Sequence, residues 1–149
     1  MSIELLVIGY GNTLRSDDGV GPKIVKVIQT LNLPGIHAVD CDLLTPELAD
    51  LIAQAREVIF VDASVDASTE VQLRSISPAE SSQIFAHATH PRTLLALARD
   101  VFGHAPRAWW LTIPVENLEI GEKLSRKAEL GMAQALKEIK ARARFGGPY

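Results

Sequence analysis

Apolar and polar positions along the chain change their spacing in a regular order, which predicts strands alternating with helices. Residues 3–9 form a nearly continuous run of Ile, Leu and Val, typical of a strand covered on both faces. Residues 20–31 repeat apolar side chains at helical spacing. Further strands are expected at 36–40, 57–63 and 108–113, and residues 71–76 alternate in the way of a half-exposed edge strand.

Three more helices follow from start and stop signals. The first begins at Thr45, where Thr is the N-cap and Pro46 takes the first helical position, and runs to about residue 55. The second covers residues 91–102 and ends at Gly103, a residue type that favours the helix C-cap. The third covers residues 123–144.

Strands that alternate with helices predict an α/β fold. We expect one three-layer domain over residues 1–149, with a five-stranded, mostly parallel, twisted sheet and helices on both faces. A length of 149 residues suits one domain with a substantial core.

Composition narrows the function classes. The formal net charge is −3 and no long basic run is present, which argues against nucleic acid as a partner. The sequence shows neither an apolar run of membrane-spanning length nor an N-terminal signal pattern, so we expect a cytoplasmic protein that does not enter a membrane. Cys41 is the only cysteine, and a small half-buried side chain is favoured there over a nucleophile.

The loop between the first strand and the first helix, residues 9–21, carries two adjacent carboxylates, Asp17 and Asp18. Ligands bind at the carboxyl ends of strands in open α/β sheets. Gly9 and Gly11 partly fit a dinucleotide-binding pattern, but Leu14 stands where the third glycine belongs. Two carboxylates would also repel a pyrophosphate, so this function is disfavoured.

A metal site fits the same loop better. Asp62 ends the strand at 57–63, so its carboxylate and that of Asp17 or Asp18 are expected to converge. His87 or His90 would supply a third ligand, a set that suits zinc, nickel or a similar divalent ion. The structural alternatives are a helix N-cap for Asp17 and a turn residue for Asp62. Pro91 predicts an extended residue before it, so the two histidines do not form a pair on one helix face.

A phosphoacceptor receiver domain has a similar acidic arrangement, but it needs a Lys after the fifth strand. Residues 111–114 contain none, so the receiver function is disfavoured. A nucleophile elbow, a His-Glu-x-x-His motif and a phosphate-binding loop are also missing. Trp109 and Trp110 are most simply explained by packing on the sheet.

Four segments together resemble the nickel–iron hydrogenase maturation endopeptidases. They are residues 9–21, 58–63, 87–97 and 114–121, and with the last helix they span almost the whole chain. The resemblance implies an endopeptidase that removes a short C-terminal extension from the hydrogenase large-subunit precursor after nickel has been inserted. Nickel supplied by the precursor is then the recognition element, and zinc or cadmium can substitute for it. A metal-dependent chaperone that binds the precursor without cutting is the alternative.

The resemblance assigns metal binding and catalysis to Asp18, Asp62 and His87, with His90 as the fallback and Asp17 able to share the role of Asp18. Glycine-rich backbone at Gly9–Gly11 would let the substrate chain approach closely. Many members have Glu in place of Asp18. Residues 40–47 lack the Asp-Gly-Gly-Thr-like turn of many members and resemble instead the branch serving bidirectional, NAD-linked hydrogenases.

Overall fold

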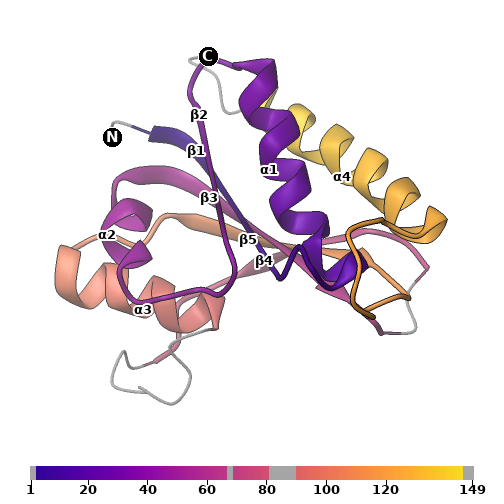
Figure 1. The fold of residues 1–149 in the computed structure, drawn as a ribbon. Coiled ribbons are helices and arrows are strands. Elements are labelled where there is room, and N and C mark those ends of the chain that lie inside the picture. The colour runs from indigo at the N-terminus through magenta and orange to yellow at the C-terminus, as the bar shows by residue number, and fades with distance from the viewer. Residues whose placement is uncertain (1–2, 67–68, 81–89, 146–149) are drawn as a thin grey trace.

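The computed structural model describes residues 3–66, 69–80 and 90–145, and it shows one sheet with helices on both faces (Figure 1). The five strands lie in the order β2-β1-β3-β5-β4. Every neighbouring pair is parallel except β4 with β5. This confirms the predicted α/β fold class, including the edge strand. The strands are β1 (Ile3–Tyr10), β2 (Ile36–Cys41), β3 (Ala55–Ser64), β4 (Gln72–Ile76) and β5 (Arg107–Pro114).

The helices divide between the two faces of the sheet. Helices α1 (Val20–Leu31) and α4 (Arg126–Phe145) cover one face, and α2 (Leu48–Ala53) and α3 (Pro91–Phe102) cover the other (Figure 1). Strand β1 contributes buried side chains to both cores, because Leu5 and Val7 face α1 and α4 while Leu6 and Ile8 face α2 and α3. The continuous apolar run is therefore explained by a strand covered on both sides.

Two helix starts differ from the sequence prediction. Helix α2 begins at Leu48, and Thr45 instead starts a turn in which its carbonyl accepts the Leu48 N–H at 3.1 Å. Helix α4 begins at Arg126, because the Ser125 hydroxyl accepts the Ala128 N–H at 3.1 Å and so caps the helix. Helices α1 and α3 have the predicted bounds.

The topology directs attention to one end of the sheet. Helix α1 leaves β1 on one face, whereas α2 leads into β3 from the other face, so the connections diverge between β1 and β3. Such a divergence opens a crevice at the carboxyl ends of the two strands, where α/β proteins bind ligands.

Among the described residues, we find no helix with the length and apolar character needed to cross a membrane.

Candidate functional site

Asp18 and Asp62 come together at the carboxyl edge of the sheet. Asp18 lies in the short helix η1 (Ser16–Gly19) that follows β1, and Asp62 lies near the end of β3. The Asp18 carboxylate accepts the Asn12 N–H at 2.7 Å, which fixes it within its loop. Its negative charge acts on Asp62 and raises the pKa of that residue. Two of the three predicted ligands are thus electrostatic neighbours, and the third, His87, lies outside the described residues.

The protein environment makes Asp62 a strongly perturbed carboxyl group. Burial and the charge of Asp18 raise the pKa of Asp62 to about 6, although the Tyr10 hydroxyl, the Trp110 indole and the Ala63 backbone N–H favour its ionised form. A carboxylate held beside a second carboxylate in a partly buried place is relieved by a bound cation or by a proton. Perturbed groups of this kind concentrate at functional sites.

Tyr10 is a neighbour of Asp62 that the sequence prediction missed. Gly9 pairs with Val61 between β1 and β3, so Tyr10 is the next residue along beside Asp62. Burial and the nearby Asp62 charge raise the pKa of the Tyr10 hydroxyl above its ordinary value, so it stays protonated and can donate. An aromatic residue at the end of a buried strand, directly before the acidic loop, was the available signal.

Trp110 joins this group from β5 and links it to His90. Its buried Nε1 makes no hydrogen bond of regular geometry with any described residue. The indole N–H nevertheless lies close enough to Asp62 to lower the pKa of that carboxyl group. The His90 ring meets Trp110 edge to face, with 5.3 Å between ring centroids. His90 is also the extended N-cap of α3, where its Nδ1 accepts the Arg92 N–H at 3.1 Å. The prediction of an extended residue before Pro91 is therefore confirmed.

Asp17 is a structural carboxylate. Its side chain is 0% exposed and accepts the backbone N–H groups of Glu116, Asn117 and Ser125 and the Ser125 hydroxyl, at 2.7–3.0 Å. Burial alone would raise the pKa of Asp17, but these four hydrogen bonds lower it below the ordinary value. Because Asp17 is enclosed and fully engaged, the structure favours Asp18 as the carboxylate of this pair that is available to a ligand.

Further contacts tie the same two loops together. Arg15 pairs with Gly121 in a short parallel bridge, in which the Gly121 N–H binds the Leu14 carbonyl at 2.9 Å and the Ser16 N–H binds the Gly121 carbonyl at 2.8 Å. The Ser16 hydroxyl donates to the Glu119 carbonyl at 2.8 Å. The loop that carries Asp18 is therefore braced against the loop that follows β5.

The glycines of the first loop serve the chain itself. A Cβ at Gly9 would collide with the Gly21 carbonyl oxygen, and one at Gly11 would collide with the Asp18 carbonyl oxygen. Gly11 also has a φ of +146°, which side-chain-bearing residues rarely adopt. The expected close approach of a substrate chain at Gly9–Gly11 is thus wrong, because residues of α1 and η1 fill that space.

An open cleft of about 550 Å³ extends from Asp62 over the carboxyl ends of β3 and β5 and the start of β4. Its lining residues include Trp110, Thr112 and Pro114 of β5, together with Asp66 and Arg74. Its size and its position beside Asp62 suit an extended segment of polypeptide better than a deeply enclosed small molecule.

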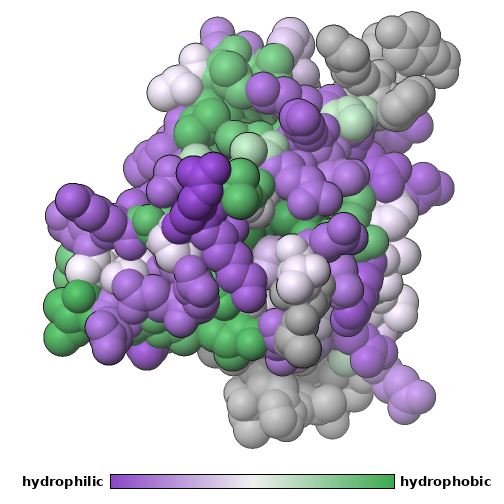
Figure 2. Space-filling model, turned by 90° about the vertical axis from the view of Figure 1, so that its right-hand side faces the viewer, coloured by the Kyte–Doolittle hydropathy of each residue, from purple (hydrophilic) through white to green (hydrophobic). Residues whose placement is uncertain are grey.

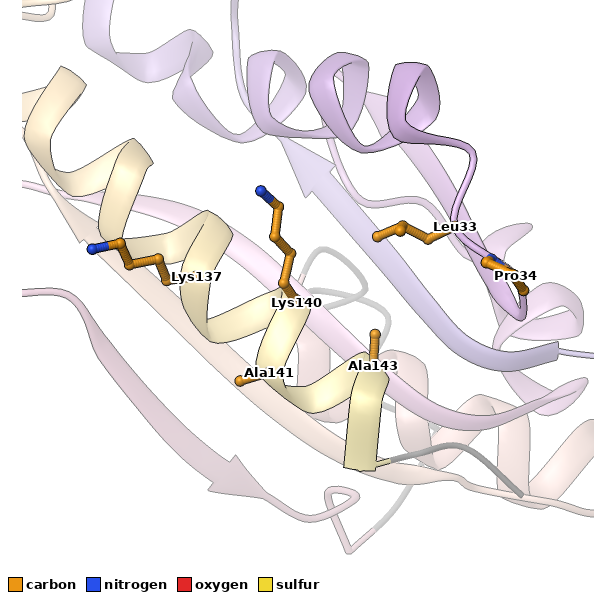
Figure 3. Close-up of a pocket in the computed structure, with 6 residues that line it drawn as sticks. All are labelled: Leu33, Pro34, Lys137, Lys140, Ala141 and Ala143. Atoms are coloured by element: carbon orange, nitrogen blue, oxygen red, sulfur yellow. The ribbon is translucent and has the colours of Figure 1, made fainter. Parts of the chain in front are cut away.

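Two other features lie apart from this chemistry. Burial and the charges of Asp40 and Asp42 raise the pKa of the Cys41 thiol, which disfavours the nucleophilic thiolate. A separate cavity of about 460 Å³ lies between α4 and the loop that follows α1 (Figure 3). Leu33, Pro34 and Lys140 are among its lining residues, and Lys140 extends from α4 toward α1 (Figure 3). Among the described residues that line this cavity none is acidic, and neither Asp18 nor Asp62 is one of them.

Replacing Asp62 by Asn is expected to stabilise the protein above pH 6. The pKa of Asp62 is raised from 3.8 to about 6 on folding, so the folded state keeps a proton that the unfolded chain loses between these values. The free energy of unfolding therefore falls as pH rises through this window, by about 3 kcal/mol at most. In thermal unfolding, Asp62→Asn should raise Tm by roughly 5–10 °C at pH 8 and change it little at pH 4.

The exposed Asp66 offers a matched control for this measurement, since Asp66→Asn should shift Tm by similar small amounts at both pH values. An Asp62→Asn variant with the same Tm difference at pH 4 and pH 8 would contradict the raised pKa.

Comparisons with solved structures identify the fold. The chain superimposes on the hydrogenase maturating endopeptidase HybD from E. coli with a TM-score of 0.73 and 23% identity, covering 96% of this chain and 93% of that one. The [NiFe] hydrogenase maturation protease HycI from Thermococcus kodakarensis gives 0.72 and 17%, covering 94% and 92%. This chain has the hydrogenase maturation protease fold. No family model matches the sequence, and the comparison with curated proteins gives no match.

A hydrogenase 2 maturation peptidase from a Thaumarchaeota archaeon shares the same fold, with a TM-score of 0.68 and 20% identity over 93% of this chain and 96% of that one. The likeness extends over nearly the full length of each protein, so the fold is shared along the whole chain. The described residues contain no group of three or more His, Cys, Asp or Glu side chains arranged to hold a metal ion. Within them, the site consists of two carboxylates.

Proposed function

We propose that this protein is an endopeptidase that removes a C-terminal extension from the precursor of a nickel–iron hydrogenase large subunit. The observation that carries the proposal is the pair Asp18 and Asp62, held together at the carboxyl edge of a sheet with the maturation protease fold. The adjoining cleft beside β3 and β5 supports it, because it offers room for an extended chain end. We propose further that the precursor belongs to a bidirectional, NAD-linked hydrogenase.

Nickel enters this proposal as part of the substrate. The residues fit a cation, because Asp62 and Asp18 are neighbouring carboxylates, and burial together with the charge of Asp18 raises the pKa of Asp62. Asp18, Asp62 and His87 would hold the ion, with His90 as the alternative imidazole. A divalent ion can supply a Lewis acid or an activated water when bound.

The protein's own residues orient the reacting groups. Tyr10 and Trp110 present donors to Asp62, and Asn12 holds Asp18 through its backbone N–H. The Asp17 brace keeps the Asp18 loop in one conformation, so the two carboxylates meet the substrate without rearrangement.

Incubating the purified protein with nickel-loaded precursor tests the proposal directly. Mass spectrometry should show one shortened large subunit and one defined C-terminal peptide. Nickel-free precursor, as the matched control, should remain uncut because it lacks the ion that the aspartate pair recognises. Stable binding of the nickel-loaded precursor without release of a peptide would instead show the chaperone function.

A further inference from the structure

The braced loops present an unusual pair of exposed apolar side chains, Leu14 and Ile120. They directly precede the bridged residues Arg15 and Gly121, so they are neighbours across the two backbones. Leu14 is 59% exposed and Ile120 is 94% exposed. Asp17, Ser16 and Arg15 hold the backbone beneath them, so this apolar pair is fixed rather than carried on a loose loop.

Exposed apolar side chains also occur in the other loops at this edge. The structure describes eight large hydrophobic side chains that are exposed, and four of them lie in the loops that follow β1, β2, β3 and β5. These four are Leu14, Leu43, Val65 and Ile120. Figure 2 looks onto the side of the molecule where the loops after β1 and β5 lie, and it shows hydrophobic surface among hydrophilic atoms. Apolar groups that surround a site on rigid loops are typical of protein–protein contact.

The charge of the same loops indicates what kind of protein fits. Residues 11–19, 42–47, 65–71 and 115–125 carry nine acidic side chains, all but Asp17 at least partly exposed, against two basic ones, Arg15 and Lys123, although the whole chain has a net charge of only −3. The rest of the molecule is therefore net basic. A second copy of this chain would meet this edge with the same negative charge and be repelled, whereas a surface rich in Lys and Arg would be attracted.

We propose that the carboxyl edge, anchored by Leu14 and Ile120, is the docking surface for the folded body of the protein being processed. The matching surface of that partner is apolar and bordered by basic side chains. This inference rests on the function proposed above. Leu14 lies four residues before Asp18 in one braced loop, so a partner seated on the apolar pair contacts the loop that carries Asp18.

Binding of nickel-loaded large-subunit precursor to immobilised protein tests the docking surface. Leu14→Ser and Ile120→Ser should each raise Kd by about tenfold, because truncating an apolar anchor removes most of its contact. Leu130→Ser is the matched control, since Leu130 is equally exposed at 60% but lies on α4, and it should keep the wild-type Kd. Raising NaCl from about 50 to 300 mM should weaken wild-type binding through charge screening.

Three other outcomes of these experiments would contradict the proposed docking surface. Wild-type Kd in both loop variants, with precursor still bound and cut, would overturn the docking surface and leave the protease function intact. A wild-type protein that neither binds nor cuts the precursor would overturn both. Concentration-dependent dimers in light scattering that Ile120→Ser abolishes would assign the surface to a second copy instead.

Discussion

Asp62→Asn is expected to reduce cleavage of nickel-loaded precursor by at least about a hundredfold in a protein that remains folded. The amide cannot carry the negative charge that a divalent ion requires, and losing one such ligand removes several kcal/mol of interaction. A hundredfold loss corresponds to about 2.7 kcal/mol. Asp18→Asn and His87→Ala should lose activity to a similar extent. The measurement is the initial rate of peptide release, followed by mass spectrometry.

Unfolding cannot explain this loss, because the same Asp62→Asn change is expected to raise Tm at pH 8. The exposed His37 and Asp50 lie away from the carboxyl edge, so His37→Ala and Asp50→Asn serve as controls that should cleave at the wild-type rate. Wild-type cleavage by Asp62→Asn or by Asp18→Asn would refute the role of the aspartate pair.

Asp17→Ala is expected to destabilise the fold by about 3–5 kcal/mol at pH 7. The change leaves the N–H groups of Asn117 and Ser125 without their acceptor and opens a small void, and each unsatisfied donor costs about 1–3 kcal/mol. The loss should appear as a lower urea midpoint and a lower extrapolated free energy of unfolding.

The pH dependence distinguishes Asp17 from Asp62. Hydrogen bonding lowers the pKa of Asp17, so its contribution to stability is present above the ordinary value of 3.8 and is lost as pH falls through the lower, folded-state pKa. The difference in stability between wild type and Asp17→Ala should therefore shrink in acid. Asp42→Ala, at an exposed carboxylate, is the control and should change stability by less than about 0.5 kcal/mol. Equal stability of Asp17→Ala and wild type at pH 7 would contradict the inference that the hydrogen bonds of Asp17 stabilise the fold.

Local patterns predicted the architecture well wherever one physical signal dominated. The apolar run at residues 3–9 and the helical spacing at 20–31 placed β1 and α1, and alternation at 71–76 placed the edge strand β4. The two late helix starts had competing signals. Pro46 fits both a helix start and a turn, and Ser125 lies inside the predicted helix at 123–144 although Ser before a helical run favours the cap position.

The site was partly predictable from the sequence. Topology implied that groups following β1 and β3 meet at one edge, which brought Asp18 and Asp62 together. Sequence could not separate Asp17 from its neighbour Asp18, because the partners of Asp17 lie 99–108 residues further along the chain. Tyr10 was missed for a similar reason: an aromatic residue at the end of a strand is only a local signal, whereas its relation to Asp62 follows from the β1–β3 register.

The long separation between Asp17 and its partners has a consequence for the order of assembly. Strands β1, β2 and β3 can associate through segments made early, but the groups that hold η1 come from residues 116–125, after β5. Contacts so distant along a chain form late, because closing a long loop is entropically costly. A nascent or truncated chain that ends before β5 therefore contains both aspartates yet lacks the groups of residues 116–125 that hold η1.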